Sequence, residues 1–253
     1  MVYHGLNTIG GKTMHYTSSA IEEGLSHDDW TVRFKWAKNK DWTPTPEQVD
    51  IGLTDKDRDV RWIWASRMDF TPTPEQIERG LTDPDRNVRW QWTQRMDFTP
   101  TPEQIERGLI DVDIDVRMSW ILRTDYSPTP KQIERGLTDV YLDVRLVWAK
   151  KTNYTPTPEQ IERGLTDPES KIRRMWTKRM DFIPTPEQVE RGLTDYPYIV
   201  IEWLKRTDIA WTQAQIQRGL RHEKQEIREA WEQMLKEQHN QKTDALDISF
   251  III

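Results

Sequence analysis

The stretch Thr71–Phe98, TPTPEQIERGLTDPDRNVRWQWTQRMDF, recurs along the chain and decides its fold. Its glycine returns at intervals of 28 residues six times and of 27 residues once. This glycine is found at Gly24, Gly52, Gly80, Gly108, Gly136, Gly164, Gly192 and Gly219. A fixed period of this length is typical of a solenoid, in which each repeat buries its apolar face against its neighbours.

Each repeat begins with the signals of a short helix. Thr73 can cap the helix, Pro74 suits its first position and Gln76 can complete a capping box. Gly80 either ends this helix or allows a neighbouring backbone to approach closely. The pattern also predicts ion pairs four residues apart within the helix. These pairs are Glu75/Arg79, Glu103/Arg107, Glu159/Arg163 and Glu187/Arg191.

A second helix follows in each repeat. Asp83 and Pro84 mark its expected start. Val88, Trp92 and Met96 follow at a spacing of four residues and form its predicted buried stripe. An arginine near the end of this helix forms a recurring row, for which the expected role is to bind the helix-terminal carbonyl groups. The row comprises Arg67, Arg95, Arg123, Arg179 and Arg206, with Lys151 in the fifth repeat.

The run DPDRNVRW, together with TPTPEQIERGLTDPD, resembles the leucine-rich-repeat variant and HEAT-like repeats of bacterial or phage-like proteins. The resemblance covers roughly residues 17–235. It implies an all-α fold, an α-solenoid of eight stacked two-helix HEAT-like repeats. It also implies a stacked Asp/Arg ladder, which is interrupted in the seventh repeat by Val200. The ladder maps onto Asp55/Arg61, Asp83/Arg89, Asp111/Arg117, Asp139/Arg145 and Asp167/Arg173.

The sequence departs from that family in three ways. Its period is a few residues longer, glycine stands where the variant family usually has leucine, and the cysteine cluster of one branch is absent. We therefore expect no iron–sulfur site of that kind, no other metal site and no cofactor. The five histidines occur only near the two ends and lack metal-ligand spacing. No catalytic constellation is evident, so the expected protein is not an enzyme.

The two ends of the chain differ from the repeats. Residues 1–16 are expected to form an arm or cap, residues 17–240 the repeat solenoid, and residues 241–253 an apolar tail. Gly10-Gly11-Lys12-Thr13 shares part of a phosphate-binding loop, but its spacing is wrong for that motif. The tail can fold back onto the last repeat, add to a partner's sheet, or drive self-association.

The composition limits the class of protein. Hydrophobic residues make up 36% of the chain and charged residues 31%, which suits a thin repeat array. The net charge of -6 does not favour binding of nucleic acid over the whole surface. The chain shows no signal-peptide pattern and no apolar run of about 18 residues, so we expect a cytoplasmic protein without membrane contact.

The predicted binding surface lies on the second helices. A helical wheel places the position of Trp90 opposite the buried stripe, with the position four residues later beside it. If the wheel is rotated by ~40°, Trp62 and Trp90 are buried against the next repeat instead. Large exposed apolar patches usually mark interaction sites, and tryptophan is a common hot-spot residue. The predicted partner-binding residues are Phe34, Trp62, Trp90, Met118, Leu146, Lys150, Arg174, Lys178 and Lys205.

Three functions are compatible with these features of the sequence. The leading hypothesis is a protein-binding scaffold, inhibitor or adaptor that uses the concave face, with apolar anchors and a basic end that favours an acidic segment of the partner. The alternative is a nucleic-acid-binding HEAT-like protein, in which aromatic residues stack on bases and basic residues contact phosphates. The third is a structural spacer or self-assembling component that associates through the tail.

Overall fold

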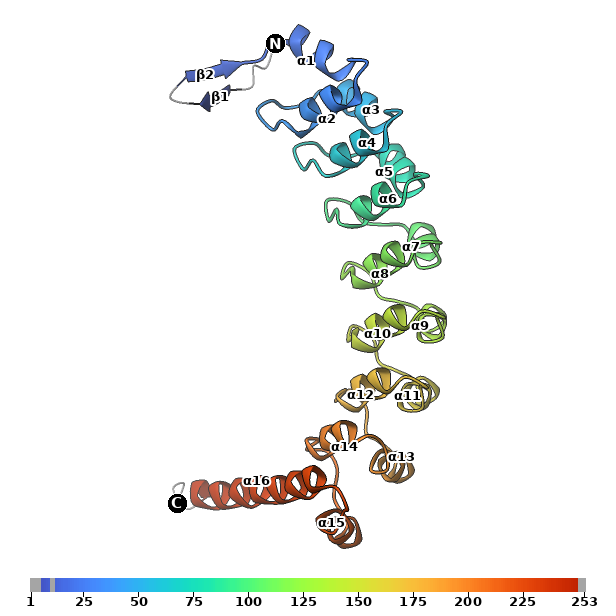
Figure 1. Cartoon of the computed structure of the whole chain (residues 1–253), viewed down its shortest axis with the longest axis vertical. Coiled ribbons are helices and arrows are strands. Elements are labelled where there is room, and N and C mark those ends of the chain that lie inside the picture. The colour runs from blue at the N-terminus through green and yellow to red at the C-terminus, as the bar shows by residue number, and fades with distance from the viewer. Residues whose placement is uncertain (1–5, 10–11, 250–253) are drawn as a thin grey trace. The chain divides into compact units, whose positions relative to one another are not determined.

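The computed structural model describes residues 6–9 and 12–249, with side chains described for residues 16–240. The chain divides into two compact units, residues 1–126 and 127–253. Each unit contains four repeats, and each repeat contributes two helices (Figure 1). The predicted α-solenoid fold is therefore confirmed.

The N-terminal unit begins with a small antiparallel hairpin, in which Leu6 pairs with His15 and Ile9 with Lys12. This hairpin is an addition to the predicted all-α fold. The strands are β1 (Leu6–Ile9) and β2 (Lys12–His15). The first helices of the four repeats are α1 (Ser18–Leu25), α3 (Pro46–Leu53), α5 (Pro74–Leu81) and α7 (Pro102–Gly108). The second helices are α2 (Trp30–Lys38), α4 (Arg58–Ala65), α6 (Arg86–Thr93) and α8 (Ile114–Leu122).

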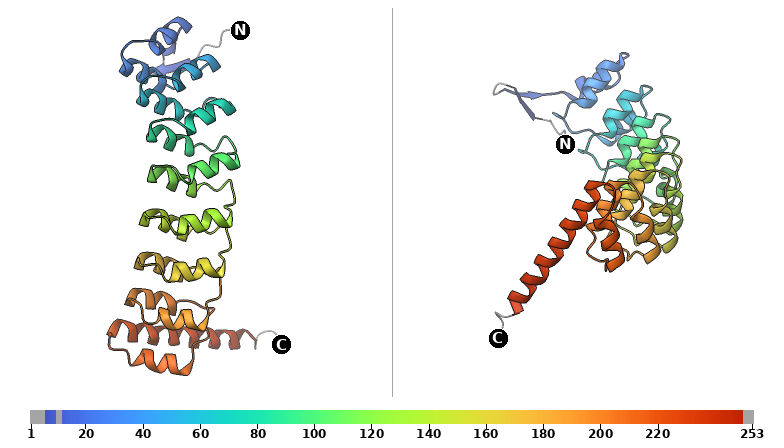
Figure 2. Two further views of the ribbon diagram at one scale, coloured as in Figure 1. Left: turned by 90° about the vertical axis from the view of Figure 1, so that its right-hand side faces the viewer. Right: turned by 60° about the horizontal axis from the view of Figure 1, so that its bottom comes forward.

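The C-terminal unit repeats this arrangement. Its first helices are α9 (Pro130–Leu137), α11 (Pro158–Leu165), α13 (Pro186–Gly192) and α15 (Gln213–Leu220). Its second helices are α10 (Leu142–Lys150), α12 (Ser170–Thr177), α14 (Pro197–Leu204) and α16 (Gln225–Ser249). Within each unit the helix pairs stack as successive layers, and the second helices pack against one another in a continuous row (Figure 2).

The predicted helix starts are confirmed for the first helices. In α5, the hydroxyl of Thr73 accepts a hydrogen bond from the backbone N–H of Gln76, and the side chain of Gln76 accepts one from the backbone N–H of Thr73. The same capping box begins every first helix from α3 to α15. These local bonds satisfy amide groups that the helix itself leaves free.

The glycine of each repeat makes room for a tryptophan. A Cβ atom added at Gly80 would lie 2.0 Å from Nε1 of Trp92, which is fully buried. The same contact recurs at the other seven repeat glycines, at distances of 1.9 to 2.2 Å. The first helix ends at this glycine in α7 and α13 and at the following leucine in the other six repeats, and the close neighbour at all eight glycines is a tryptophan side chain, not a backbone. The glycine allows the indole ring of the second helix to pack directly onto the first.

The buried arginine row joins consecutive repeats. Arg95 is 1% exposed, and its guanidinium donates hydrogen bonds to the carbonyl oxygens of Ala65 and Arg67 in the preceding repeat, at 3.1 and 2.5 Å. It also donates to Asp97 and lies 4.6 Å from the ring centroid of Phe70. The row was expected to bind carbonyl groups at the end of its own helix. Arg95 does bind carbonyl groups at the end of a second helix, but this helix belongs to the preceding repeat. Arg67, Arg123, Arg179 and Arg206 make equivalent contacts within their own units.

The Asp/Arg ladder also runs between repeats. Arg61 donates to both carboxylate oxygens of Asp83 in the next repeat, at 2.7 and 2.9 Å, and to the backbone carbonyl of Asp55 in its own. The hydrogen bond that Arg61 donates to Asp83 is the first cause of the raised pKa of Arg61. Equivalent bidentate pairs are Arg33–Asp55, Arg89–Asp111, Arg145–Asp167 and Arg173–Asp195.

The predicted interruption of the ladder by Val200 is accompanied by a second change. The next repeat has His222 in place of the aspartate, and its Nδ1 accepts a hydrogen bond from the backbone N–H of Lys224. Val200 is buried, and with His222 it lines a hollow of about 290 Å³. The arginine and the aspartate are therefore lost together at this junction.

The predicted ion pairs within the first helices are wrong. Arg79 pairs with Asp50 of the preceding repeat at 3.3 Å, instead of with Glu75 in its own helix. In the same way, Arg107, Arg163 and Arg191 pair with Glu78, Glu134 and Glu162. These arginines lie at the ends of their helices, where the adjacent repeat offers a closer carboxylate.

The second helix begins two residues later than predicted. In α6 the cap is Asp85, whose side chain accepts from the backbone N–H of Asn87, whereas Asp83 takes part in the ladder. The helix ends at Thr93, so Met96 lies in the following loop and is 55% exposed. The predicted buried stripe is therefore confirmed for Val88 and Trp92 and is wrong for Met96.

The last helix extends beyond its expected end. The repeat solenoid was predicted to end at residue 240 and to be followed by a tail, whereas the helix α16 continues to Ser249. Residues 250–253 of the predicted apolar tail lie outside the described residues, as do the side chains of residues 241–249. Gly10 and Gly11 of the loop-like motif also lie outside them. In the predicted N-terminal cap, the ring of Tyr16 packs edge-on against Trp36, with centroids 5.1 Å apart.

Candidate functional site

The predicted partner-binding residues fall into both units. Phe34, Trp62, Trp90 and Met118 belong to the N-terminal unit. Leu146 and the four basic residues belong to the C-terminal unit. We describe the two groups separately, as an apolar groove in the first unit and a basic cluster in the second.

The apolar groove lies on the surface of α6 and α8. Two hollows, of about 500 and 330 Å³, share Trp90, Ser119 and Leu122 in their walls. Trp90 is 37% exposed and Leu122 66% exposed, although both are large apolar side chains. Met118 lines the first hollow and Met96 the second. The structure therefore brings two of the predicted anchors, Trp90 and Met118, into one concave surface.

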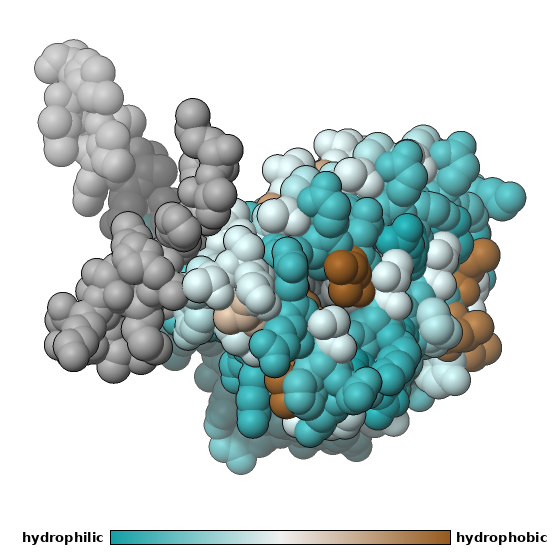
Figure 3. All heavy atoms as spheres, turned by 90° about the horizontal axis from the view of Figure 1, so that it is seen from above, coloured by the Kyte–Doolittle hydropathy of each residue, from teal (hydrophilic) through white to brown (hydrophobic). Residues whose placement is uncertain are grey.

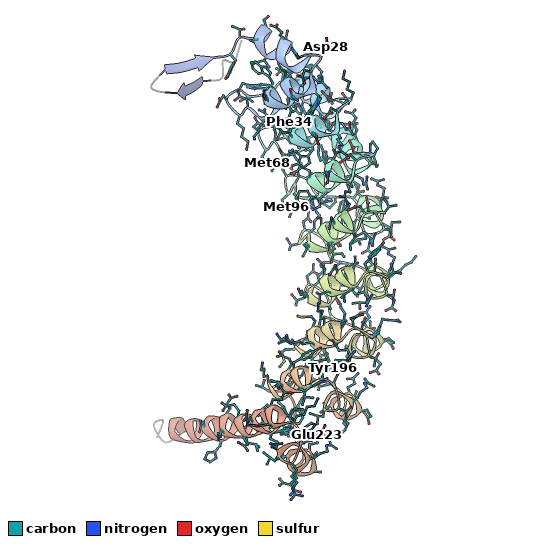
Figure 4. All side chains as sticks on the ribbon, in the orientation of Figure 1. Asp28, Phe34, Met68, Met96, Tyr196 and Glu223 are labelled. Atoms are coloured by element: carbon teal, nitrogen blue, oxygen red, sulfur yellow. The ribbon has the colours of Figure 1, made fainter. Side chains whose placement is uncertain are left out.

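Two methionines were missed because each follows the end of its helix. Met68 and Met96 come after α4 and α6, and both are exposed. In Figure 4, Phe34, Met68 and Met96 lie on the same side of the N-terminal unit. Flexible methionine side chains on a surface suit the binding of varied apolar partners. In the sequence they are marked by their place between a buried arginine and an aspartate.

The groove has a polar rim. Arg86 on α6 forms an ion pair with Asp113, the cap of α8, at 3.1 Å. Burial by itself raises the pKa of Asp113, but the bonds from Arg86 and from the backbone N–H groups of Val116 and Asp115 outweigh this effect and lower the pKa. An apolar centre with a charged rim is the usual anatomy of a protein-binding patch.

Phe34 and Trp62 are less accessible than predicted. Both are half-buried, and the ring of Phe34 packs edge-on against Trp30 with centroids 6.3 Å apart. Neither residue lines the two hollows at Trp90. In the C-terminal unit, Leu146 is likewise half-buried. The predicted apolar stripe is thus most exposed at Trp90.

The basic cluster surrounds a buried carboxylate. Glu202 on α14 is 5% exposed, and Arg174 on α12 approaches one of its carboxylate oxygens to 2.5 Å. The ammonium groups of Lys178 and Lys205 lie 3.7 and 3.4 Å from its carboxylate oxygens. Three predicted basic residues therefore converge on Glu202, which the sequence prediction did not include.

The charges of the cluster decide the ionisation of Glu202. Burial by itself raises the pKa of a carboxyl group. The hydrogen bond from Arg174 and the charges of Lys205 and Lys178 outweigh this effect and lower the pKa of Glu202. Glu202 is therefore an anion at neutral pH and holds the three cations in place.

Two tyrosines complete the cluster. The rings of Tyr196 and Tyr198 are stacked, with centroids 5.8 Å apart and planes inclined by 11°. Arg173 lies 5.9 Å from the ring centroid of Tyr196, and Arg174 lies 5.8 Å from that of Tyr198. Both rings thus already have an aromatic and a cationic neighbour.

Lys150 extends the basic surface towards α10. It lines a hollow of about 470 Å³ together with Lys178 and Met175. Lys150, Lys178 and Lys205 are all exposed on the row of second helices. The four predicted basic residues therefore belong to one region of the C-terminal unit.

The face of the molecule that is seen from above is largely hydrophilic, with hydrophobic residues in separate places (Figure 3). Among the side chains of residues 16–240, no three histidine, aspartate or glutamate residues are grouped as metal ligands. None of the helices that the structure describes is both long and apolar enough to cross a membrane.

The fold has a counterpart among solved structures. It is similar to a structure described as a leucine-rich repeat variant with a novel repetitive protein structural motif, with a TM-score of 0.63. The two sequences are 22% identical, and the match covers 85% of this chain and 79% of the other. A scan against protein-family models finds no match, and a search of curated proteins finds none either. The resemblance predicted from the repeat is therefore confirmed for the fold, and the chain is a helical repeat protein.

Proposed function

We propose that this protein is a binding scaffold that holds a protein partner through the apolar groove at Trp90. The observation that carries the proposal is the exposure of Trp90 and Leu122 beside two hollows on a largely polar molecule. Exposed apolar groups of this kind are stabilised when a partner covers them. Tryptophan is also among the residues that contribute most to protein interfaces.

The composition of the groove favours a protein segment with apolar side chains as its occupant. Its centre is formed by Trp90, Met118 and Leu122. Its rim carries the ion pair of Arg86 with Asp113 and the carboxylate of Asp115, so it has no excess of positive charge. A phosphate backbone would require free basic groups along the groove. Helical-repeat arrays commonly present an extended surface of stacked helices to their partners.

The test compares capture of proteins from a lysate of the source cells by wild type and by Trp90→Ala/Leu122→Ala. A matched control, Ile110→Ala/Val112→Ala, removes two exposed apolar side chains outside the groove. We expect a defined protein to be captured by wild type and control, and its capture to fall at least about tenfold in the groove variant.

Circular dichroism of the variants shows whether each remains folded. Capture that the groove variant retains would contradict the proposal. Capture that disappears after nuclease treatment would favour a nucleic-acid ligand instead.

A further inference from the structure

We propose that the basic cluster is a receptor for an acidic peptide segment, and that Glu202 sets how many carboxylates this segment must carry. The inference rests on the proposed function and describes the chemistry of a second contact with the partner. It concerns the C-terminal unit only, and Glu202 is the residue whose role is new.

The charge count of the cluster is the first argument. One carboxylate, that of Glu202, faces the cationic groups of Arg174, Lys178 and Lys205. Two positive charges are therefore left without a counter-charge, and Lys150 adds another beside Lys178. An incoming segment with two or three neighbouring carboxylates matches this excess, whereas a single carboxylate does not.

The accessibility of the cations is the second argument. Glu202 is buried, whereas Lys178 and Lys205 direct exposed side chains to the solvent. Arg174 is held from two sides, by Glu202 and by the ring of Tyr198. The guanidinium is thus preorganised, and the two lysines keep donors available for a ligand.

The tyrosine pair is the feature of the cluster that a nucleic-acid ligand could use. Single-stranded nucleic acids bind to exposed aromatic faces on which their bases stack. The rings of Tyr196 and Tyr198 stack on each other, and each also has an arginine close to its ring. Tyr196 and Tyr198 are 57% and 40% exposed, but one face of each ring is covered by the other ring. We therefore base the choice of an acidic peptide on the excess of positive charge around Glu202, and the oligothymidylate titration below tests the nucleic-acid alternative.

The test is a fluorescence titration of the full-length protein with a short labelled peptide of alternating glutamate and serine. A peptide with glutamine in place of glutamate serves as the uncharged probe. We expect the glutamate peptide to bind, the glutamine peptide not to bind, and the affinity to fall as salt is added. Lys178→Gln/Lys205→Gln should weaken binding at least about threefold, because it removes two exposed charges.

Glu202→Gln tests the role of the internal carboxylate. It removes one negative charge from the cluster and should strengthen binding of the glutamate peptide by about threefold or more at low salt. Lys56→Gln/Lys131→Gln serves as the matched control: like Lys178→Gln/Lys205→Gln it removes two positive charges from exposed lysines, but away from the cluster. It should leave binding unchanged. Thermal melts identify any variant that does not fold, and the exposed lysine pair tests the site without altering a buried group.

Equal binding by wild type and the Lys178/Lys205 variant would overturn the proposal. So would tighter binding of a labelled oligothymidylate that depends on the same lysines. Trp90→Ala should leave this titration unchanged, because Trp90 belongs to the other unit. If the peptide fails to bind while protein capture still depends on Trp90, only this inference is wrong and the proposed function stands.

Discussion

Replacement of Gly80 by alanine gives a direct test of the packing within a repeat. In an exposed helix this change stabilises a protein by about 0.5–1 kcal/mol. Here the new methyl group would lie 2.0 to 2.3 Å from three atoms of the buried Trp92 ring. Overpacking of this kind costs about 1–3 kcal/mol. We therefore expect Gly80→Ala to lower the free energy of unfolding by about 1–2 kcal/mol.

The effect of Gly80→Ala on the free energy of unfolding should change sign once the Trp92 ring is removed. In a Trp92→Leu background the methyl group has space, so Gly80→Ala should stabilise the protein by up to about 1 kcal/mol. Urea unfolding followed by circular dichroism measures all four members of this double-mutant cycle. The cycle at Gly52 and Trp64, which make the same contact, serves as an independent repeat of the experiment.

A stabilising effect of Gly80→Ala in the wild-type protein would refute the reasoning. Equal effects in the presence and absence of the Trp92 ring would refute it as well. The first result would mean that the ring does not restrict this position. Equal destabilisation with and without the ring would mean that the glycine is present for the conformation of its backbone and not for the space that the ring needs.

Arg95→Met should lower the free energy of unfolding by about 2–4 kcal/mol, because carbonyl groups of the preceding repeat and the carboxylate of Asp97 lose their partner. Thermal melts measure this effect, and a change below about 0.5 kcal/mol would contradict the prediction. Val200→Arg/His222→Asp should restore the missing ladder pair, with a favourable coupling of about 1 kcal/mol between the two changes in a double-mutant cycle. Each of the two changes made alone should destabilise the protein. Hydrogen bonds from Arg191 and Gln188 lower the pKa of Glu162, so its contribution to stability is complete above the ordinary pKa of 4.5 and is lost as the pH falls through the lowered value. Urea midpoints measured from pH 6 to pH 2 should therefore fall below about pH 4.5, and less steeply for Glu162→Gln.

The sequence was sufficient for features that depend on neighbours along the chain. The capping box of Thr73 and Gln76 is made within four residues, so its pattern in the sequence predicts its geometry. The period and the eight repeats follow from the same regularity. The burial of Val88 and Trp92 was predicted correctly because both lie within the helix that the wheel describes.

The errors concern contacts between repeats and the ends of helices. The partner of Arg79 was expected within its own helix, but the adjacent repeat places Asp50 closer. Met96 was expected to be buried because the wheel was continued beyond Thr93, where the helix ends. Sequence spacing within one repeat contains no information on the distance to the next repeat.

The candidate site was predicted in part for the same reason. Trp90 and Met118 were identified from the wheel, and the structure places both at one groove. Glu202 was not, because a carboxylate that occurs once cannot be recognised from the regular pattern of the repeats. Its importance depends on Arg174 of α12 and on Lys205, which directly follows α14.

The arginine contacts between repeats limit how this protein can change in length. Arg95 requires the carbonyl groups of the repeat before it, and Arg89 requires the aspartate of the repeat after it. Insertion of a complete copy of residues 71–98 supplies both sets of partners again. The shorter seventh repeat shows that one residue can be lost where the arginine still reaches its acceptors, as Arg206 does. An insertion or deletion that moves an arginine out of reach of the adjacent repeat loses these bonds. We therefore infer that this protein gains or loses length most readily in whole repeats.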